Sequence, residues 1–244
     1  MDLKDPAAKV NLIKGLTGKQ IDEARAAMPP ICIDLREQWP LFAKPLQKER
    51  DRVYENDYFW NNEEEETAIK VKFMLVSGSL SEGDYLLQGF KPTYDDSGKL
   101  IKKGGLLIER KSGDLVNTLA NWQYKETGTQ TEDRFERELR RFADYEEVYI
   151  IVEKHTGWYQ RDITERAKKI ILDSEGKEKK RKFKWKHFVA RDVKLTRRGN
   201  TEANWSVKFV DGHEQAEFYA YQFFWDFWKN KVEQDRSIMS WRTQ

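Results

Sequence analysis

Two acidic residues and a lysine stand where the sequence could support phosphodiester chemistry. Residues 106–114 read LLIERKSGD, and the opening apolar run predicts a short buried strand. Because successive side chains of a strand point to opposite faces, Glu109 and Lys111 are expected side by side on one face at the end of that strand. Burying charge is costly unless it is paired or bound to a metal, so this pair indicates a chemical site.

A second carboxylate comes from Asp84, which precedes the apolar run Tyr85-Leu86-Leu87. A turn-rich connection over residues 91–105 predicts a hairpin, with Asp84 and Glu109 on adjacent strands at comparable heights. Carboxylates are ligands for hard divalent cations such as Mg²⁺ or Mn²⁺. Lys111 would position the attacking water and stabilise the charge that develops on the phosphate. The alternative is an ordinary hairpin with a solvated Asp and a surface Glu–Lys pair.

The order of these motifs resembles the signature of the XPF-type structure-specific endonucleases, GD…ERK…D. Three further segments match in the same order: ICIDLRE from residue 31, RFERELRRF from residue 134 and YEEVYIIVE from residue 145. The resemblance covers residues 30–155 well and 203–230 loosely. It implies an α/β fold with a restriction-endonuclease-like core, in which helices flank a mixed central sheet.

The resemblance also implies roles for neighbouring residues. Asp34 would lie near the two carboxylates and contribute, as a ligand, to a second metal ion or its water shell. The main-chain carbonyl of Arg110 would add a ligand, while the pleat turns its side chain to the opposite face. Arg36, Glu37 and Arg110 would hold the site or the scissile phosphate. Asp114, part of the family signature, would cap the next helix and brace the strand end. The candidate catalytic residues are Asp84, Glu109, Lys111, Asp34, Arg36, Glu37, Arg110 and Asp114.

A basic segment interrupts the pattern beyond residue 153. The chain of 244 residues has a net charge of +2, but residues 166–198 contain 14 Lys or Arg against 4 Asp or Glu. Such a segment suits a polyphosphate partner, although basic runs are often solvated loops. Aromatic residues among the charges favour nucleic-acid contact, because bases stack on aromatic rings. The candidate DNA-binding residues are Lys180, Arg181, Lys182, Lys184, Trp185, Lys186, Arg197 and Arg198.

Other chemistries find little support in the sequence. The three histidines are not at metal-ligand spacings, and Cys32, the one cysteine, falls in an apolar strand and is expected to be a core residue. A phosphate-binding loop of the G-x-x-x-x-G-K-[ST] type is absent. The N-terminus lacks a signal-peptide pattern and no apolar run is long enough to span a membrane, so we expect a cytoplasmic protein without membrane contact.

The hydrophobic pattern divides the chain into an appendage and a nuclease domain. Residues 1–30 are expected to form two helices that end at Pro29-Pro30, and residues 31–244 the nuclease domain with a basic insertion at about 160–200. Besides the two site strands, four strands are expected, at 31–35, 69–76, 148–152 and 205–210. Two helices are expected, at 132–145 and 214–231. Residues 44–66 are mixed and predict no regular element.

Aromatic residues surround the last expected helix, residues 214–231, and predict burial on more than one side. Members of the resembled family commonly dimerise through this end of the nuclease domain. A homodimer interface is therefore the first interpretation, and packing under the basic insertion is the alternative.

Together these patterns predict a metal-dependent DNA endonuclease that cuts branched, flap or junction DNA and leaves a 5′-phosphate. The tandem helix-hairpin-helix module of eukaryotic and archaeal members has no counterpart in this sequence. In this respect the sequence resembles the standalone form of phages, plasmids and bacteria. One alternative is a non-catalytic DNA-binding or scaffold subunit that retains the fold. Another is an RNA-directed or sequence-specific nuclease.

Overall fold

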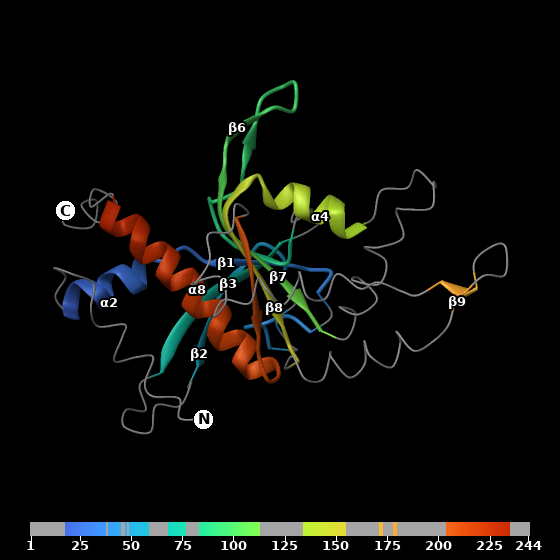
Figure 1. Cartoon of the computed structure of the whole chain (residues 1–244). Helices are drawn as coiled ribbons and strands as arrows, with labels where there is room; N and C mark the ends of the chain where they lie inside the picture. Colours follow the sequence, from blue (N-terminus) through green and yellow to red (C-terminus); the bar gives the residue numbers. More distant parts are fainter. Residues whose placement is uncertain are drawn as a thin grey trace.

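The chain forms an α/β fold around a mixed seven-stranded sheet (Figure 1). The structure, a computed structural model, describes residues 18–37, 39–44, 47, 49–58, 68–76, 83–112, 134–154, 171–172, 178–179 and 204–234. The predicted α/β class and mixed central sheet are confirmed.

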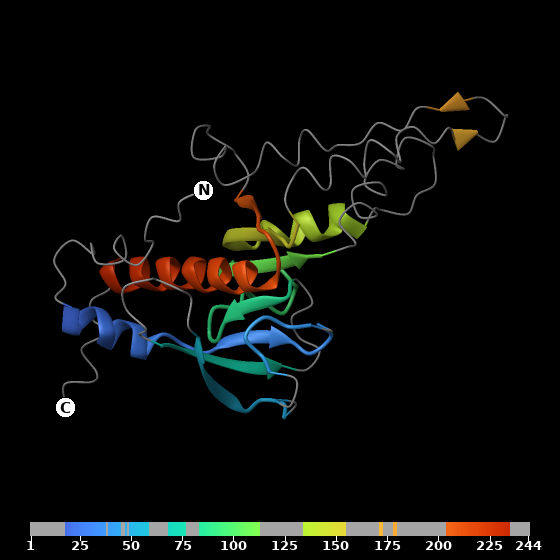
Figure 2. The same cartoon turned by 90° about the horizontal axis from the view of Figure 1, so that it is seen from below.

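The sheet combines parallel and antiparallel pairs, and its strands fan out from β7 to β2 in Figure 2. Its order is β11 (Trp205–Phe209), β8 (Tyr145–Val152), β7 (Gly104–Lys111), β4 (Tyr85–Leu87), β1 (Ile31–Asp34), β3 (Ile69–Val76) and β2 (Val53–Tyr58). The pairs β11–β8, β8–β7 and β1–β3 are parallel, whereas β7–β4, β4–β1 and β3–β2 are antiparallel. Strand β4 thus runs opposite to its neighbours β1 and β7, which carry the predicted site residues.

The predicted hairpin is confirmed, because β4 and β7 pair antiparallel, and their connection contains a further small hairpin that was not predicted. Strands β5 (Thr93–Tyr94) and β6 (Leu100–Lys102) pair antiparallel. Between them, Asp95 Oδ1 accepts hydrogen bonds from the backbone N–H groups of Ser97 and Lys99, both at 2.9 Å, and Gly98 takes a positive φ of 80°. A second two-stranded sheet, β9 (Ile171–Leu172) with β10 (Glu178–Lys179), falls in the expected basic insertion.

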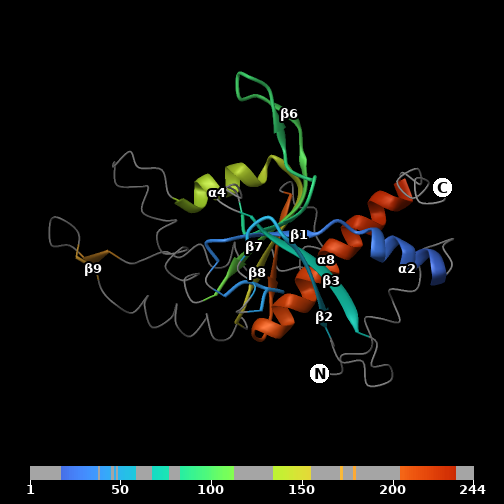
Figure 3. The ribbon, with the colours of Figure 1, turned by 180° about the vertical axis from the view of Figure 1, so that it is seen from behind.

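Helices cover both faces of the sheet. Helices α2 (Gly18–Ala27) and α8 (His213–Gln234) lie side by side (Figures 1 and 3) and pack on the face that carries Ile33, Tyr85 and Ile108. Helix α4 (Arg134–Phe142) covers the other face, where Phe142 packs in a second core cluster with Leu107 and residues of β8 and β11. Apolar alternation along β7 therefore supplies both cores, since its neighbouring residues point to opposite faces.

The aromatic residues of α8 are buried or half-buried within the single chain. Trp225 and Phe224 are fully buried, and Trp228 Nε1 donates a hydrogen bond to the Ala24 carbonyl of α2 at 2.8 Å. The prediction of burial on more than one side is confirmed, because α8 packs against both the sheet and α2. Homodimerisation through this helix remains a prediction. Within the described ranges, no helix has the length and apolar character needed to cross a bilayer.

Strand β2 is a correction to the sequence prediction, which assigned no regular element to residues 44–66. Its residues VYENDY are largely polar because β2 is an edge strand, and only Asn56 is buried along it. An edge strand that faces solvent lacks the apolar alternation by which strands are recognised. The predicted first helix and most of the basic insertion lie outside the described residues.

Close packing between β7 and α8 predicts that Gly105→Ala destabilises the fold. A Cβ at Gly105 would lie 2.6 Å from Phe227 Cζ and 2.9 Å from Phe90 Cδ1. Overpacking of this kind costs about 1–3 kcal/mol of unfolding free energy. Urea denaturation would measure it, with Gly18→Ala in α2 as the control, because a Cβ there meets no atom within 4 Å. Equal stability of the two variants would contradict this packing.

Candidate active site

Three acidic residues stand in a row across β1, β4 and β7. The registers of β1 with β4 and of β4 with β7, continued by one residue, bring Asp34 opposite Asp84 and Asp84 opposite Glu109. The backbone supports this alignment, since the Asp34 N–H donates to the Asp84 carbonyl at 3.0 Å and the Asp84 N–H to the Ile108 carbonyl at 3.1 Å. Neighbouring strands lie about 4.8 Å apart, so the three residues are adjacent. The predicted placement of Asp84 and Glu109 at comparable heights is confirmed.

Glu109 and Lys111 form a buried ion pair on the α4 side of the sheet. Lys111 Nζ lies 2.6 Å from Glu109 Oε1, and the residues are only 3% and 7% exposed, respectively. The prediction that these two side chains share a face at the end of a buried strand is therefore confirmed. The alternative of a surface Glu–Lys pair is wrong, because both groups are buried.

Glu138 of α4 joins this pair, which the sequence analysis did not foresee. Its Oε2 lies 3.4 Å from Lys111 Nζ, and the residue is 4% exposed. Glu138 precedes Phe142 by four residues, so the two share a face of α4. The spacing of four residues between Glu138 and Phe142 was the sequence signal that could have placed Glu138 on the buried face of α4.

Burial raises the pKa values of two carboxyl groups at the row, and neighbouring negative charge adds to the rise. Burial, followed by the charges of Glu109 and Glu37, raises the pKa of Asp84 well above its ordinary value, although the Arg110 N–H donates to Asp84 Oδ2 at 2.7 Å. Burial also raises the pKa of Glu109; Lys111 opposes this shift and Glu138 adds to it. Positive charge placed between Asp84 and Glu109 would relieve both effects.

Asp34 is engaged mainly by Arg36. Arg36 Nε donates to both carboxylate oxygens at 3.0 Å, the Arg36 N–H donates to Oδ1 at 2.9 Å, and a further guanidinium nitrogen contacts Oδ2. Asp34 is 2% exposed, whereas the Arg36 side chain is 70% exposed. The hydrogen bond and charge of Asp34, with the charges of Asp84 and Glu109, raise the pKa of Arg36. The structure thus brings an exposed guanidinium to the row, and the role of Asp34 as a ligand stays a prediction.

Arg110 points to the opposite, α8 side of the sheet, as its place between Glu109 and Lys111 predicts. Its guanidinium lies 2.6 Å from Glu37 Oε2 and donates to Glu153 at 2.8 and 3.0 Å. The side chain is 9% exposed, so Arg110 ties the ends of β7 and β8 to the segment after β1. The expectation that Arg110 and Glu37 hold the site agrees with this bracing geometry.

Two residues that the sequence analysis did not single out for the site complete this brace. Glu153 follows β8, and His213 begins α8, with Nδ1 2.9 Å from Glu153 Oε1 and Nε2 3.7 Å from Glu217 Oε1. Glu217 in turn accepts a hydrogen bond from the Phe42 N–H at 2.9 Å. The contacts of Glu153 with His213 and of Glu217 with Phe42 join residues far apart in the sequence, so no local pattern predicts them.

The donor set of the row fits a hard divalent cation. Within the described ranges, no group of three or more His, Cys, Asp and Glu side chains could hold a metal ion. Asp84, which is half-buried, and Glu109, which is buried, nevertheless form an adjacent all-oxygen pair whose charges disfavour each other. Mg²⁺ is commonly held by one or two carboxylates and completes its coordination with water and substrate phosphate oxygens. Two carboxylates suffice for such a site.

A cavity of about 350 Å³ lies on the same sheet face as the row, but no residue of the row lines it. Cys32, Met74, Val76 and Leu86 line it, and Val76 is the register partner of Asp34. Burial raises the pKa of the Cys32 thiol to about 11. Cys32 is 3% exposed, which confirms its assignment to the core and argues against a nucleophilic role.

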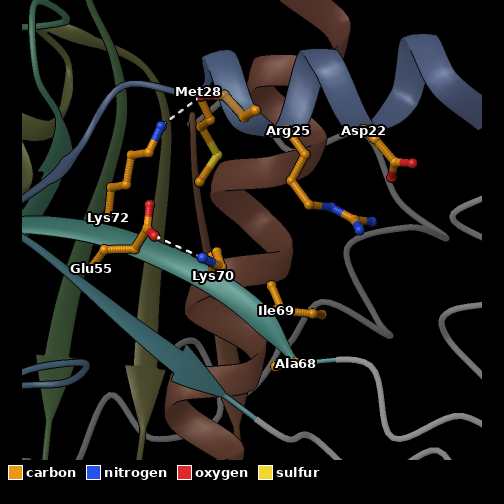
Figure 4. Close-up of a pocket in the computed structure, with 9 residues that line it drawn as sticks. Asp22, Arg25, Met28, Glu55, Ala68, Ile69, Lys70 and Lys72 are labelled. Atoms are coloured by element: carbon orange, nitrogen blue, oxygen red, sulfur yellow. Dashed lines mark hydrogen bonds and ion pairs between the residues drawn. The ribbon is translucent and has the colours of Figure 1, made fainter.

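A second cavity, of about 230 Å³, lies between α2 and the start of β3, at the opposite end of β3 from the row (Figure 4). There Lys72 donates to the Ala26 carbonyl at 2.6 Å and Lys70 pairs with Glu55 at 3.3 Å. These contacts attach α2 to the sheet and contribute no group to the row.

Asp114 and all eight candidate DNA-binding residues lie outside the described residues. Searches of protein-family models, of curated proteins and of solved structures found no match to the chain.

The contacts of Glu153 with Arg110 and His213 predict that the fold loses stability in acid. Glu153→Gln should remove the part of this pH dependence that the Glu153 carboxylate causes. Burial would raise the pKa of Glu153, but hydrogen bonds from His213 and Arg110 outweigh it and lower the pKa from 4.5 to about 2. Because the folded-state pKa lies below the unfolded one, the carboxylate stabilises the fold above pH 4.5, and this contribution is lost as the pH falls toward 2.

Glu153→Gln should therefore lower the unfolding free energy by about 1.5–3 kcal/mol at pH 7, as for a charged hydrogen bond, and by less as the pH falls. Denaturant unfolding between pH 7 and 2.5 would measure this, with Glu55→Gln, from an exposed pair, as the control. A difference from wild type that stays constant with pH would contradict the assignment.

Proposed function

We propose that the chain is a metal-dependent DNA endonuclease of the XPF type, with a restriction-endonuclease-like core. The observation that carries the proposal is the group of Asp84, Glu109 and Lys111 on neighbouring strands, in which Glu109 and Lys111 are buried and Asp84 is half-buried. A fold gains little stability from burying such charges, because desolvation offsets their attraction. Their order along the chain, with the surrounding motifs, resembles the family signature and supports the same reading.

Each side chain of the group has a distinct task in the proposed hydrolysis. A divalent cation, when bound, would polarise the scissile phosphate and lower the pKa of a water. Asp84 and Glu109 would hold that cation, with the Arg110 carbonyl as a further ligand. Lys111 would orient the attacking water and stabilise charge on the phosphate.

The reaction adds the water oxygen to phosphorus and breaks the bond to the 3′ oxygen, which leaves a 5′-phosphate and a 3′-hydroxyl. Arg36 is suited to contact the substrate, since its exposed guanidinium lies beside the row and guanidinium binds phosphate well. Its pairing with Asp34 fixes its direction.

The proposed substrate is DNA, with branched, flap or junction forms as the first candidates. The basic segment 166–198 supplies positive charge suited to a nucleic-acid backbone. We also propose a cytoplasmic setting, as expected for a phage or bacterial enzyme.

A non-catalytic DNA-binding or scaffold subunit is the second candidate, and one observation favours it. Arg36 and Lys111 already neutralise Asp34 and Glu109, so two carboxylates of the row have positive partners without any cation. In such a subunit these pairs would be structural. The two candidates differ in whether phosphodiester bonds are cut.

The proposed function predicts cleavage of end-labelled DNA in Mg²⁺ or Mn²⁺ and none in EDTA. The substrates are duplex, single strand, flap, fork and four-way junction. Asp84→Asn and Lys111→Met should each lower the cleavage rate by about 10²–10³, because each removes charge that stabilises the transition state. Lys70→Met, from an exposed ion pair, is the matched control and should cut like wild type.

Circular dichroism and thermal unfolding would confirm that the variants fold. Binding of DNA without cutting under every metal condition would contradict the enzyme and favour the scaffold. Cutting that survives both EDTA and Asp84→Asn would place the chemistry elsewhere.

A further inference from the structure

The cavity of about 350 Å³ on the same sheet face as the row has the form of a ligand site. Its floor is apolar and comes from three strands: Cys32 of β1, Leu86 of β4, and Met74 and Val76 of β3. A concave apolar surface that is edged by a few polar groups is the usual form of a site for a small molecule or group. The row itself leaves this cavity without a role.

The cavity lies one residue pair away from the row. On β1, Cys32 precedes Asp34 by two residues, so both side chains point to the same face, about 7 Å apart along the strand. Cys32 is paired with Leu86 in the same register that, continued, brings Asp34 opposite Asp84. Val76, which lines the cavity, is the register partner of Asp34. A ligand in the cavity would therefore extend directly to the row.

Polar residues from two separate segments edge the cavity. Asp51 precedes β2 and is attached to β3, because its backbone N–H donates to the Leu75 carbonyl at 2.8 Å. Gln88, Gly89 and Lys91 follow β4, so they come from the other side of β1. Each of these four lining residues is exposed. The edge of the cavity therefore combines a carboxylate, an amide and an ammonium around the apolar floor.

Asp51 holds its place at the cavity by an unusual backbone conformation. Its φ is 56°, in the left-handed region that residues other than glycine seldom adopt. Conformations of this kind cluster at ligand sites, where the surrounding structure maintains them. Burial raises the pKa of Cys32, the charge of Lys91 opposes this rise and the charge of Asp51 adds to it. Both charged groups therefore lie close to the cavity floor.

A single nucleobase fits this cavity in size and in chemistry. Its volume is near the lower end of the roughly 300–1,000 Å³ of small-molecule sites, so it has room for one base and not for a base pair. The apolar floor suits the face of a base and the polar edge suits its hydrogen-bonding groups, as in enzymes that hold a base out of the stack. The phosphate of that nucleotide would lie toward the row, where Arg36 presents an exposed guanidinium.

We propose that the cavity receives one unpaired base of the DNA substrate, from a nucleotide next to the cut, and so positions the scissile phosphate at the row; this inference rests on the proposed function. Asp51 accepts a hydrogen bond from the exocyclic amino group of cytosine or adenine, whereas thymine presents a carbonyl oxygen that a carboxylate does not bind. A base enters the cavity only when it leaves its stack, which costs least where the DNA is already unpaired. The cavity therefore selects DNA with an unpaired nucleotide at the cut.

Fluorescence of 2-aminopurine, an adenine analogue that brightens when it leaves the base stack, reports whether the cavity is occupied. The analogue is placed on either side of the mapped cut, and several nucleotides away as the positional control. Binding of this DNA by Lys111→Met, which leaves the strand uncut, should raise the fluorescence at one flanking position and not at the distant one. Adding Gln88→Trp, whose ring would fill the cavity mouth, should abolish the rise. Adding Lys102→Trp instead, at an exposed position of β6 outside the cavity, is the matched control and should preserve it.

Asp51→Asn tests the hydrogen bond and keeps the backbone, because Asn tolerates the left-handed region as Asp does. Wild-type kcat/KM should be about tenfold higher with cytosine or adenine than with thymine at the flanking nucleotide, as for a specific base contact. Asp51→Asn should lower this ratio to about twofold or less, since a carboxamide also donates to the thymine oxygen. Asp57→Asn removes an exposed negative charge from β2 and should keep the wild-type ratio, which controls for weaker repulsion of DNA.

Wild-type protein that cuts DNA with equal kcat/KM for cytosine, adenine and thymine would overturn the inference and keep the proposed function. Fluorescence that rises at neither flanking position, or a rise that persists with Gln88→Trp in place, would overturn it in the same way. Thermal unfolding shows whether the variants fold, and if Gln88→Trp does not, the ratio in Asp51→Asn decides. Wild-type protein that cuts no DNA under any metal condition would overturn the proposed function and the inference with it.

Discussion

The buried ion pair of Glu109 and Lys111 is the interaction on which the rest of the candidate site depends. Charges in a protein interior are tolerated only with partners, and these two are held 2.6 Å apart on one strand face. Their burial requires α4 above them and β4 and β8 on either side of β7. The sheet order therefore determines that Asp84, on β4, meets Glu109, and that Glu138, on α4, meets Lys111.

Strand β7 separates chemistry from bracing by its pleat. On the α4 side it presents Glu109 and Lys111, and on the α8 side it presents Arg110, which Glu37 and Glu153 hold. Three consecutive charged residues at a strand end would repel or compete if they shared a face. Alternation gives Arg110 partners of its own, so the strand end is held from behind without using the charges of Glu109 and Lys111. Preorganisation of this kind is what electrostatic stabilisation of a transition state requires.

Local periodicity was enough to predict much of this arrangement. The apolar run before Glu109 predicted β7, the turn-rich connection over residues 91–105 predicted the pairing of β4 with β7, and the pleat predicted the opposite directions of Lys111 and Arg110. Long-range partners escaped prediction because no local pattern encodes them: Glu138 reaches Lys111 from a helix, and His213 reaches Glu153 across 60 residues. Strand β2 was missed for a different reason, since an exposed edge strand carries little apolar signal. The aromatic helix was read correctly as buried on several sides, and its known partners, α2 and the sheet, belong to the same chain.

A crystal structure with Mn²⁺ and a DNA duplex tests the central claim most directly, because anomalous scattering locates the ion independently of any activity. If Asp84 and Glu109 hold the cation, one Mn²⁺ should lie about 2.1 Å from carboxylate oxygens of both residues. An ion bound elsewhere, or a row in which Lys111 still covers Glu109 and no ion is present at saturating Mn²⁺, would contradict that claim.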